Sequence, residues 1–179
     1  MYDARLEGFL SGWHKVRTYR DALPVTGMNT VPIREQEAFP GRLFTAPNGE
    51  TVLDFGQNIA GYVEMTLTAH AGQKVLLTCG ETLDEHGNFT QENFQDRGRH
   101  KEGGTAQMLE LVCKEGVNHW KPSFTIMGFR YAKVETDIDL TGAEFTAHAV
   151  YSEMPVTGSF GRGNADVDQL VKNSVWSQK

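Results

Sequence analysis

The sequence predicts an all-β fold, an antiparallel β-sandwich of the jelly-roll type, with a single helix leading out of the domain at its C-terminal end. Three observations support this prediction. Between residues 50 and 152, short runs of alternating apolar and polar residues follow one another. Glycine, proline, asparagine and aspartate separate these runs, as expected for strands joined by turns. A helical period appears only after residue 164.

Residues 1–49 are predicted to be a linker and the tail of a preceding module. Four of the six prolines of the chain fall here, and no regular period of apolar residues runs through the segment. Only short extended pieces, such as residues 31–35 and 42–45, are expected within it.

The stretch LDFGQNIAG, residues 53–61, spaces Gly56 and Gly61 as a phosphate-binding loop would. Such a loop needs a lysine and then a serine or threonine after the second glycine, and it must open a helix. Here Tyr62 and Val63 follow Gly61, and residues 62–68 alternate as a strand does. A nucleotide site is therefore not expected.

The same stretch is instead predicted to be a corner between two strands, residues 51–55 and 62–69. Its glycines would allow the tight turn, because glycine adopts backbone conformations that other residues avoid. The side chains of Gln57 and Asn58 are suited to satisfy turn N–H and C=O groups or to contact a neighbouring domain.

Further strands are predicted at residues 74–79, 106–113, 120–126, 129–135 and 143–151. A longer insertion, residues 81–105, separates the first two. In the strand at 120–126, Trp120, Phe124 and Ile126 are expected on one face, and Pro122 marks an edge or a bulge.

A helix is predicted from residue 164 onward. Asn164 is a favourable N-cap, and Asp166 and Asp168 suit the positive end of the helix dipole. Its expected apolar face consists of Val167, Leu170, Val171, Ser174 and Val175. Because neither glycine nor proline ends this helix, residues 153–179 are expected to be a connector and the truncated start of a further domain.

Composition excludes several classes of function. The net charge of −6 argues against a nucleic-acid surface, and no run of about 20 apolar residues is present to span a membrane. The basic cluster of Arg97, Arg99, His100 and Lys101 is expected to be a solvated loop. The absence of an apolar segment after Met1 favours the cytoplasm over export.

The two cysteines, Cys79 and Cys113, each fall in an alternating apolar pattern, which predicts two buried free thiols. A disulfide between them remains possible at this point.

No set of residues predicts an active site, and we expect neither a metal nor another cofactor. A glycosidase site or a calcium site would need several carboxylates, and one acidic segment contains Glu81, Asp84, Glu85, Glu92 and Asp96. However, residues 83–89 are predicted to form a hairpin turn instead. The histidines lack metal-binding spacing, and no nucleophile motif is present. The aromatic rings of Tyr62, Trp120 and Tyr131 are able to stack on sugars, although the core is the commoner place for such rings.

Six blocks carry a resemblance to a known family. They are YDARLE at 2–7, VLDFGQNIAGYVEM at 52–65, GETLDEHGNFTQENF at 80–94, WKPSFTIMGFRYAKVE at 120–135, VYSEMPVTGSF at 150–160 and LVKNSVWSQ at 170–178. In this order they resemble a bacterial α-L-rhamnosidase, an inverting glycoside hydrolase. The segment at 96–116 departs from the family pattern, so no contact role is expected for that loop.

This resemblance implies a multidomain enzyme in which β-sandwich modules precede an (α/α)6 barrel that carries the catalytic carboxylates. Residues 50–152 would be the concanavalin-like β-sandwich, and the acidic catalytic motif would follow the end of this chain. The resemblance therefore implies no catalytic residue here, and the absent barrel of the same polypeptide is the expected partner.

Two alternatives remain from other classes of protein. A carbohydrate-binding module would recognise rhamnose-containing glycans, and an unrelated adhesion domain would share only the sandwich. The residues expected to contact carbohydrate or a neighbouring domain are Gln57, Asn58, Glu92, Asn93, Trp120 and Tyr131.

Overall fold

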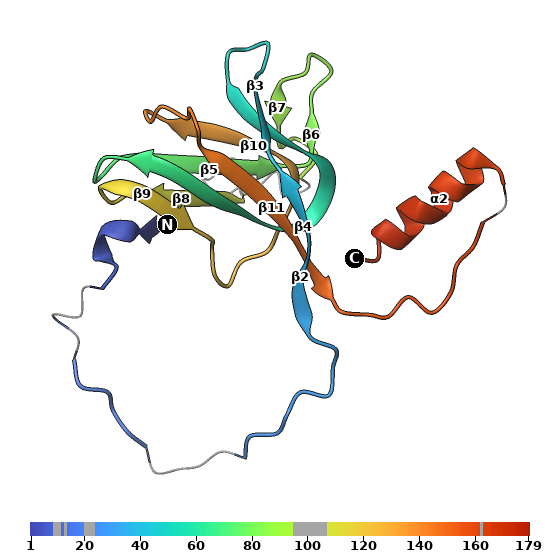
Figure 1. Cartoon of the computed structure of the whole chain (residues 1–179), viewed down its shortest axis with the longest axis horizontal. Coiled ribbons are helices and arrows are strands. Elements are labelled where there is room, and N and C mark those ends of the chain that lie inside the picture. Colours follow the sequence, from blue (N-terminus) through green and yellow to red (C-terminus); the bar gives the residue numbers. More distant parts are fainter. Residues whose placement is uncertain (9–11, 13, 20–23, 95–106, 162) are drawn as a thin grey trace.

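A computed structural model describes residues 1–8, 12, 14–19, 24–94, 107–161 and 163–179. Within these residues the chain forms a curled sheet of nine strands, a separate two-stranded sheet and one α-helix (Figure 1). The large sheet contains β1 (Tyr2–Asp3), β2 (Ile33–Pro40), β3 (Arg42–Thr45), β4 (Thr51–Ala69), β5 (Lys74–Gly80), β8 (Met108–Val112), β9 (Gly116–Trp120), β10 (Met127–Thr136) and β11 (Glu144–Ser152). The small sheet pairs β6 (Thr82–Leu83) with β7 (Phe89–Thr90), a 3-10 helix spans Ala4–Leu6, and α2 spans Ala165–Trp176.

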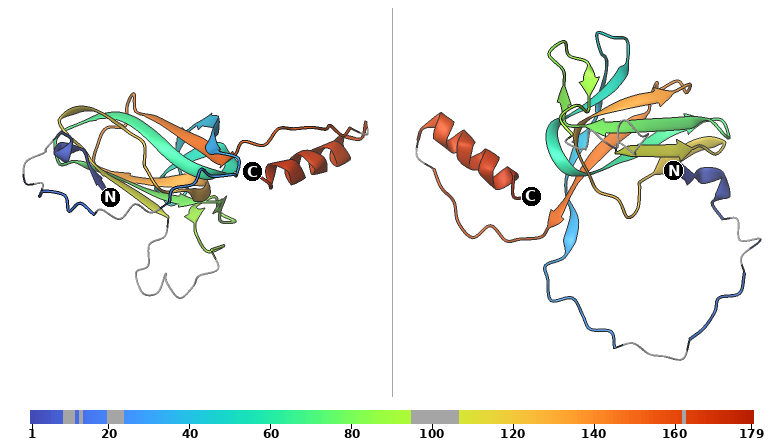
Figure 2. Two further views of the ribbon diagram at one scale, coloured as in Figure 1. Left: turned by 90° about the horizontal axis from the view of Figure 1, so that it is seen from below. Right: turned by 180° about the vertical axis from the view of Figure 1, so that it is seen from behind.

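The long strand β4 organises the sheet. The strand order is β1-β8-β5-β10-β4-β11-β2, and β3 and β9 also pair with β4. The first part of β4 lies between β3 and β10, whereas its last part lies between β11 and β9. The sheet therefore curls about β4, as Figures 1 and 2 show. All of its strand pairs are antiparallel except β1 with β8. The prediction of a mostly β protein with a C-terminal helix is confirmed.

The predicted corner at residues 53–61 is wrong, because β4 runs through this segment as one strand. Gly56 does have a positive φ of 77°, but it lies in a bulge rather than in a turn. At Gly61 the β11 backbone comes so close that a Cβ atom would lie 1.8 Å from the His148 carbonyl oxygen. The two glycines therefore allow one strand to bulge and to pack closely against its neighbour.

Alternating residues of the central strands form the core, as the sequence predicts. In β4 the buried set includes Val63, Met65 and Leu67, and the rings of Phe55 and Phe129 meet edge to face at 5.5 Å. Members of the core on other strands are Val75, Leu77, Cys79, Leu109, Leu111, Phe145, Ala147 and Ala149. Cys79 and Cys113 are both buried free thiols, which confirms that prediction.

The predicted turn at residues 83–89 is confirmed. The Asp84 carboxylate accepts hydrogen bonds from the backbone N–H groups of His86 and Asn88, and Gly87 has a φ of 84°. The turn joins β6 to β7.

The strand predicted at residues 120–126 is wrong. Strand β9 ends at Trp120, and the following residues form a loop. Pro122 has no N–H to offer to a ladder, and Phe124 has a φ of 61°, which lies outside the β region. As a result the side chains of Phe124 and Ile126 are exposed instead of facing the core with Trp120.

Two extended pieces that the sequence predicts before residue 50 belong to the sheet. Strand β2 pairs with β11 and β3 pairs with the start of β4. Asp96 and the basic cluster Arg97, Arg99, His100 and Lys101 lie outside the described residues.

The predicted helix is confirmed, with Asn164 as its N-cap accepting from the N–H groups of Asp166 and Val167. None of its residues is buried, and Leu170 remains 64% exposed. The helix reaches the sheet through Trp176 in its last turn and Lys179 just beyond it. In the described part of the chain, no helix has the length and apolar character that a membrane span requires.

Candidate functional site

The β4 bulge lies where β4 pairs with β10. Ile59 lies opposite Phe129 and Asp54 lies opposite Tyr131, so four residues of β4 lie opposite the single residue Arg130. An Asp54 carboxylate oxygen accepts from the Gly56 N–H at 2.7 Å and from the Arg130 guanidinium at 2.9 Å. The other carboxylate oxygen accepts from Arg130 at 3.1 Å, which completes a two-point ion pair. Side chains thus fix the shape of the bulge.

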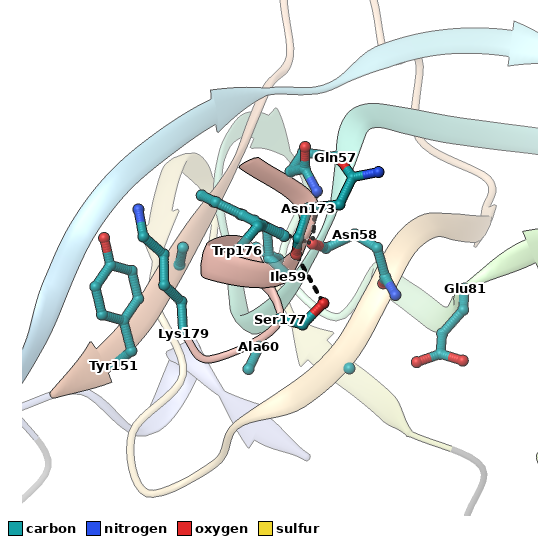
Figure 3. Close-up of a pocket in the computed structure, with 12 residues that line it drawn as sticks. Gln57, Asn58, Ile59, Ala60, Glu81, Tyr151, Asn173, Trp176, Ser177 and Lys179 are labelled. Atoms are coloured by element: carbon teal, nitrogen blue, oxygen red, sulfur yellow. Dashed lines mark hydrogen bonds between the residues drawn. The ribbon is translucent and has the colours of Figure 1, made fainter. Parts of the chain in front are cut away.

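The carbonyl of Asn58, in this bulge, accepts two hydrogen bonds. One comes from the Gln57 amide at 3.1 Å and the other from the Trp176 indole N–H at 2.8 Å. The Trp176 ring also meets Phe39 of β2 edge to face, with the ring centroids 6.0 Å apart. The bulge and β2 together hold the last turn of α2, and Figure 3 shows Trp176 beside Asn58 of the bulge.

Lys179 makes a second contact between the end of the chain and the sheet. Its ammonium donates to Glu37 at 2.8 Å and lies over the rings of Tyr151 and Trp176, 5.0 and 4.6 Å from their centroids. Burial alone would raise the pKa of Glu37, but its hydrogen bonds with Lys179 and Tyr151 hold the pKa below its usual value. We call the contacts of Trp176 and Lys179 with the sheet the helix latch.

Beside the helix latch lies a cleft of about 470 Å³, which Figure 3 shows. Gln57, Asn58 and Glu81 line it from the sheet, and Trp176 and Lys179 line it from the helix end. Two of the residues predicted for a contact site, Gln57 and Asn58, are therefore side by side at a surface shared by sheet and helix.

The other predicted contact residues lie at different places. Asn93 donates to Glu81 at 2.7 Å, which puts it next to a residue of this cleft, and Glu92 is its exposed neighbour. Trp120 stacks on Tyr2 with the ring centroids 5.4 Å apart, in another cleft. Tyr131 is half-buried, and the Arg130 guanidinium lies 4.9 Å from its ring centroid.

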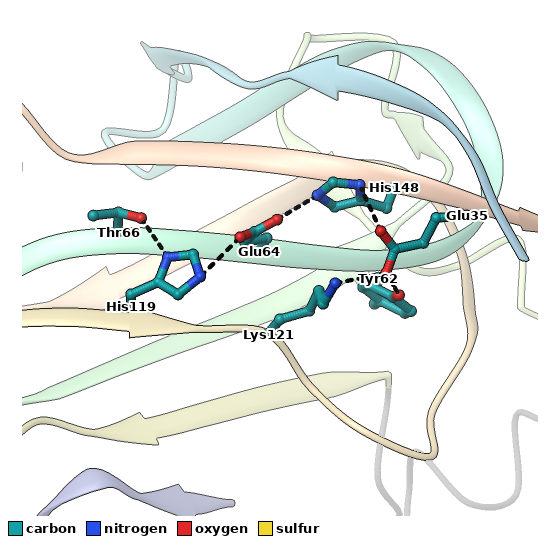
Figure 4. A network of polar contacts seen from close by, with 7 residues as sticks. All are labelled: Glu35, Tyr62, Glu64, Thr66, His119, Lys121 and His148. Atoms are coloured by element: carbon teal, nitrogen blue, oxygen red, sulfur yellow. Dashed lines mark hydrogen bonds and ion pairs between the residues drawn. The ribbon is translucent and has the colours of Figure 1, made fainter.

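A polar network that the sequence analysis missed crosses four strands (Figure 4). Glu64 of β4 holds His148 of β11 at 2.6 Å and His119 of β9 at 3.0 Å. His119 also contacts the Thr66 hydroxyl at 3.0 Å. Every second residue of β4 points to this face. The alternation in the sequence therefore predicts which β4 side chains share the face, but not which side chains of other strands they contact.

Glu35 of β2 forms the other half of this network. It accepts from Lys121 at 2.7 Å and from the Tyr62 hydroxyl, and it lies 3.6 Å from His148. Lys121, and then Tyr62, hold the pKa of Glu35 below its usual value. Burial, and then Glu35, raise the pKa of Tyr62 to about 12. The network ties β2, β11, β4 and β9 together on one face of the sheet.

This network is not arranged for glycoside hydrolysis, although it contains two carboxylates. Glu35 and Glu64 contact the two ring nitrogens of His148, one on each side. An inverting hydrolase keeps the space between its carboxylates for the sugar and a water molecule, whereas here the imidazole fills it. In addition, no group of three or more His, Cys, Asp or Glu side chains among the described residues is arranged to bind a metal ion.

Comparison with known proteins places this chain in a family. The profile of the bacterial alpha-L-rhamnosidase concanavalin-like domain matches residues 44–151. An alpha-L-rhamnosidase from Formosa agariphila is 30% identical over 148 residues, which cover 79% of this chain and 15% of that protein. One from Streptomyces avermitilis is 27% identical over 99% of this chain and 18% of its own length.

Solved structures are similar as well. The alpha-L-rhamnosidase of Aspergillus terreus matches with a TM-score of 0.65 and 30% identity, over 82% of this chain and 17% of that one. The alpha-L-rhamnosidase from Dictyoglumus thermophilum matches with a TM-score of 0.77 over 99% of this chain and 21% of that chain. Because the two are only 22% identical, this match supports the fold alone. The chain thus spans less than a quarter of the proteins that it matches here, and it belongs to the family of the bacterial alpha-L-rhamnosidase concanavalin-like domain.

Proposed function

We propose that this chain is a non-catalytic β-sandwich module of a longer α-L-rhamnosidase, an enzyme that removes terminal α-L-rhamnose from glycosides. In that polypeptide the module would support the (α/α)6 catalytic barrel. The family assignment supports this proposal, as does the small share of each relative that the chain covers. A Streptomyces avermitilis α-L-rhamnosidase solved in complex with L-rhamnose is 26% identical and covers 83% of this chain.

We also propose a division of the chain into parts. Residues 50–152 would form the main part of the module. The pairing of β2 and β3 with its sheet supports adding this part of the preceding segment 1–49 to the module. Residues 153–179 would be the connector and the start of the helical domain.

The helix latch is the observation that carries the support role. Ring packing of Trp176, its hydrogen bond to Asn58 and the ion pair of Lys179 with Glu37 join the end of α2 to the sheet. These are contacts of three kinds at the end of a helix in which no residue is buried. Through them the sheet sets the position from which a following domain would continue.

Hydrolysis of an aryl α-L-rhamnoside tests the proposal. We expect the 179-residue chain to release no more aryl alcohol than a blank, whereas the longer polypeptide that carries this sequence turns the substrate over. A Trp176→Ala variant of the longer polypeptide should keep its chemistry but lose thermal stability. Turnover by the 179-residue chain, or an inactive longer polypeptide, would contradict the proposal.

Carbohydrate binding is the alternative, and the aromatic rings give it little support. Stacking on sugar requires an open ring face, but Tyr2 stacks on Trp120 and Arg130 lies over Tyr131. Calorimetric titration of the chain with L-rhamnose at millimolar concentration tests the alternative. Heat of binding that saturates would favour a carbohydrate-binding module, and we expect none.

A further inference from the structure

The loop between β9 and β10 presents an apolar tip. Phe124 is fully exposed, with a relative exposure of 108%, and Ile126 is 53% exposed. Phe124 also has a φ of 61°, a conformation that bulky residues rarely adopt. A single exposed apolar residue is ordinary. An exposed phenylalanine in an unfavourable backbone conformation is unusual, and such a combination suggests a functional role.

The two ends of this loop are anchored. At its start, Lys121 pairs with Glu35 of β2 at 2.7 Å, which Figure 4 shows, and Pro122 is buried. At its end, the Gly128 N–H donates to the Gln107 side-chain oxygen at 2.9 Å. In Figure 1 the loop projects from the sheet between β9 and β10. Both ends of the loop that carries the apolar tip are thus held by contacts with other parts of the protein.

A cleft of about 450 Å³ lies beside the loop. Met108, Trp120 and Met127 contribute apolar side chains to it, and Pro122 and Thr125 of the loop form part of its wall. Met108 is itself 41% exposed. Residues 122–127 carry no charge, and the charge of Lys121 is paired. An uncharged surface centred on an aromatic residue has the composition of the core of a protein interface.

We propose that residues 122–126 and this cleft form a docking surface for another domain of the same longer polypeptide, with Phe124 as its anchor. This inference rests on the proposed function, because it requires that polypeptide. Four α-L-rhamnosidases each have only 13–18% of their length matched by this chain, so most of such a protein lies outside it. A tethered domain has a high effective concentration, and therefore one aromatic anchor beside a modest cleft is enough. A separate partner would need a larger interface.

Photo-crosslinking tests this inference. Phe124 is replaced by p-benzoylphenylalanine in the longer polypeptide, and crosslinked peptides are identified by mass spectrometry. The matched control carries the same probe at Val117, which is 64% exposed on the edge strand β9. We expect position 124 to crosslink within the same molecule to residues outside 1–179, and position 117 to do so far less.

Crosslinks only between copies, only within residues 1–179, or none at all would overturn the inference. The rhamnoside assay on the unsubstituted longer polypeptide tests the proposed function separately. If the longer polypeptide is active but the expected crosslinks are missing, only the inference of a docking surface is contradicted. If the longer polypeptide is inactive but the crosslinks are found, the proposed function is contradicted and the docking surface is still supported.

Hydrogen exchange gives a second measurement. Amides of residues 123–126 should exchange about tenfold more slowly in the longer polypeptide than in the 179-residue chain, because docking excludes solvent from the tip. The Phe124→Ser variant should lose most of this difference, whereas Val117→Ser should keep it. Equal exchange rates in the two unsubstituted proteins would also overturn the inference.

Discussion

Arg130 and Asp54 form a two-point ion pair across the β4 bulge, with N–O distances of 2.9 and 3.1 Å. Arg130 is the single β10 residue opposite the four bulged residues of β4. The Asp54 side chain is only 14% exposed, so it depends on this partner and on the Gly56 N–H for the hydrogen bonds that water would otherwise supply. The ion pair therefore holds the bulge in the shape that receives the end of α2.

Replacing Arg130 by methionine keeps much of the side-chain length but leaves the Asp54 carboxylate without its cation. We expect the free energy of unfolding to fall by about 1–3 kcal/mol, the range for losing a partly buried charged hydrogen bond. The matched control is Arg34→Met, because Arg34 pairs with Glu153 where both side chains are more than half exposed. In Arg34→Met the free energy of unfolding should fall by about 0.5 kcal/mol or less. Urea denaturation measures both, and equal losses would contradict the prediction.

The stability difference between wild type and Arg130→Met should depend on pH. Burial alone would raise the pKa of Asp54, but the hydrogen bonds from Arg130 and Gly56 hold it below its usual value. A carboxyl group with a lowered folded-state pKa stabilises the fold above its unfolded pKa, about 3.9, and loses this effect as the pH falls through the folded value. The difference should therefore shrink below about pH 4. A difference that grows in acid would contradict this assignment.

Gly61→Ala should destabilise the protein more than any substitution at an open glycine. The new Cβ would lie 1.8 Å from the His148 carbonyl oxygen, so β4 and β11 would have to move apart. We expect a loss of about 2–3 kcal/mol or more, at or above the usual range for overpacking. Gly158→Ala is the control, because its Cβ would meet nothing within 4 Å. Thermal unfolding followed by circular dichroism measures both, and a Gly61→Ala protein as stable as the control would contradict the structure.

The sequence predicts those parts of the fold that depend on local periodicity. The alternation of Val63, Met65 and Leu67 is visible in the sequence because side chains on a strand alternate between its two faces. The role of Gly61 is not visible, because it depends on His148 of another strand. Residues 120–126 also alternate in type, yet Phe124 adopts a positive φ and turns away from the core. Local pattern alone does not distinguish that loop from a strand.

The site is predictable only in part, for a similar reason. The sequence predicts Gln57 and Asn58 as contact residues, but the contact of Asn58 with Trp176 uses the backbone carbonyl rather than the side chain. The network of Glu35, Glu64 and His148 joins β2 and β4 to β11, and His148 lies 84 residues after Glu64 in the sequence. Finding it requires the strand register, which the sequence alone did not supply.

The Glu35→Gln variant should lower the pKa of Tyr62. Burial is the largest cause that raises this pKa to about 12, and Glu35 is the next. Removing the charge of Glu35 should therefore bring the pKa part of the way back toward 10. Tyrosinate absorbance during an alkaline titration measures the change, and Glu153→Gln, at an exposed carboxylate, is the control. A Tyr62 pKa unchanged in Glu35→Gln would contradict the network.

The same titration has a consequence for stability. A phenol with a raised folded-state pKa stabilises the fold below its unfolded pKa, about 10, and loses this effect as the pH rises through the folded value. The Glu35→Gln variant should therefore lose less stability than wild type between about pH 10 and 12. Parallel stability curves for the two proteins over this range would contradict the coupling.

The helix latch should depend on the Trp176 side chain and not on the Asn58 side chain. Trp176→Phe keeps an aromatic ring beside Phe39 but removes the N–H that binds the Asn58 carbonyl. We expect it to weaken the latch by about 1 kcal/mol, the usual net contribution of a hydrogen bond. Asn58→Ala keeps the carbonyl and should leave the latch intact. Hydrogen exchange of the α2 amides measures the effect, because a looser latch lets the helix open more often. Faster exchange in Asn58→Ala than in Trp176→Phe would mean that the amide side chain, and not the indole bond, holds the helix to the sheet.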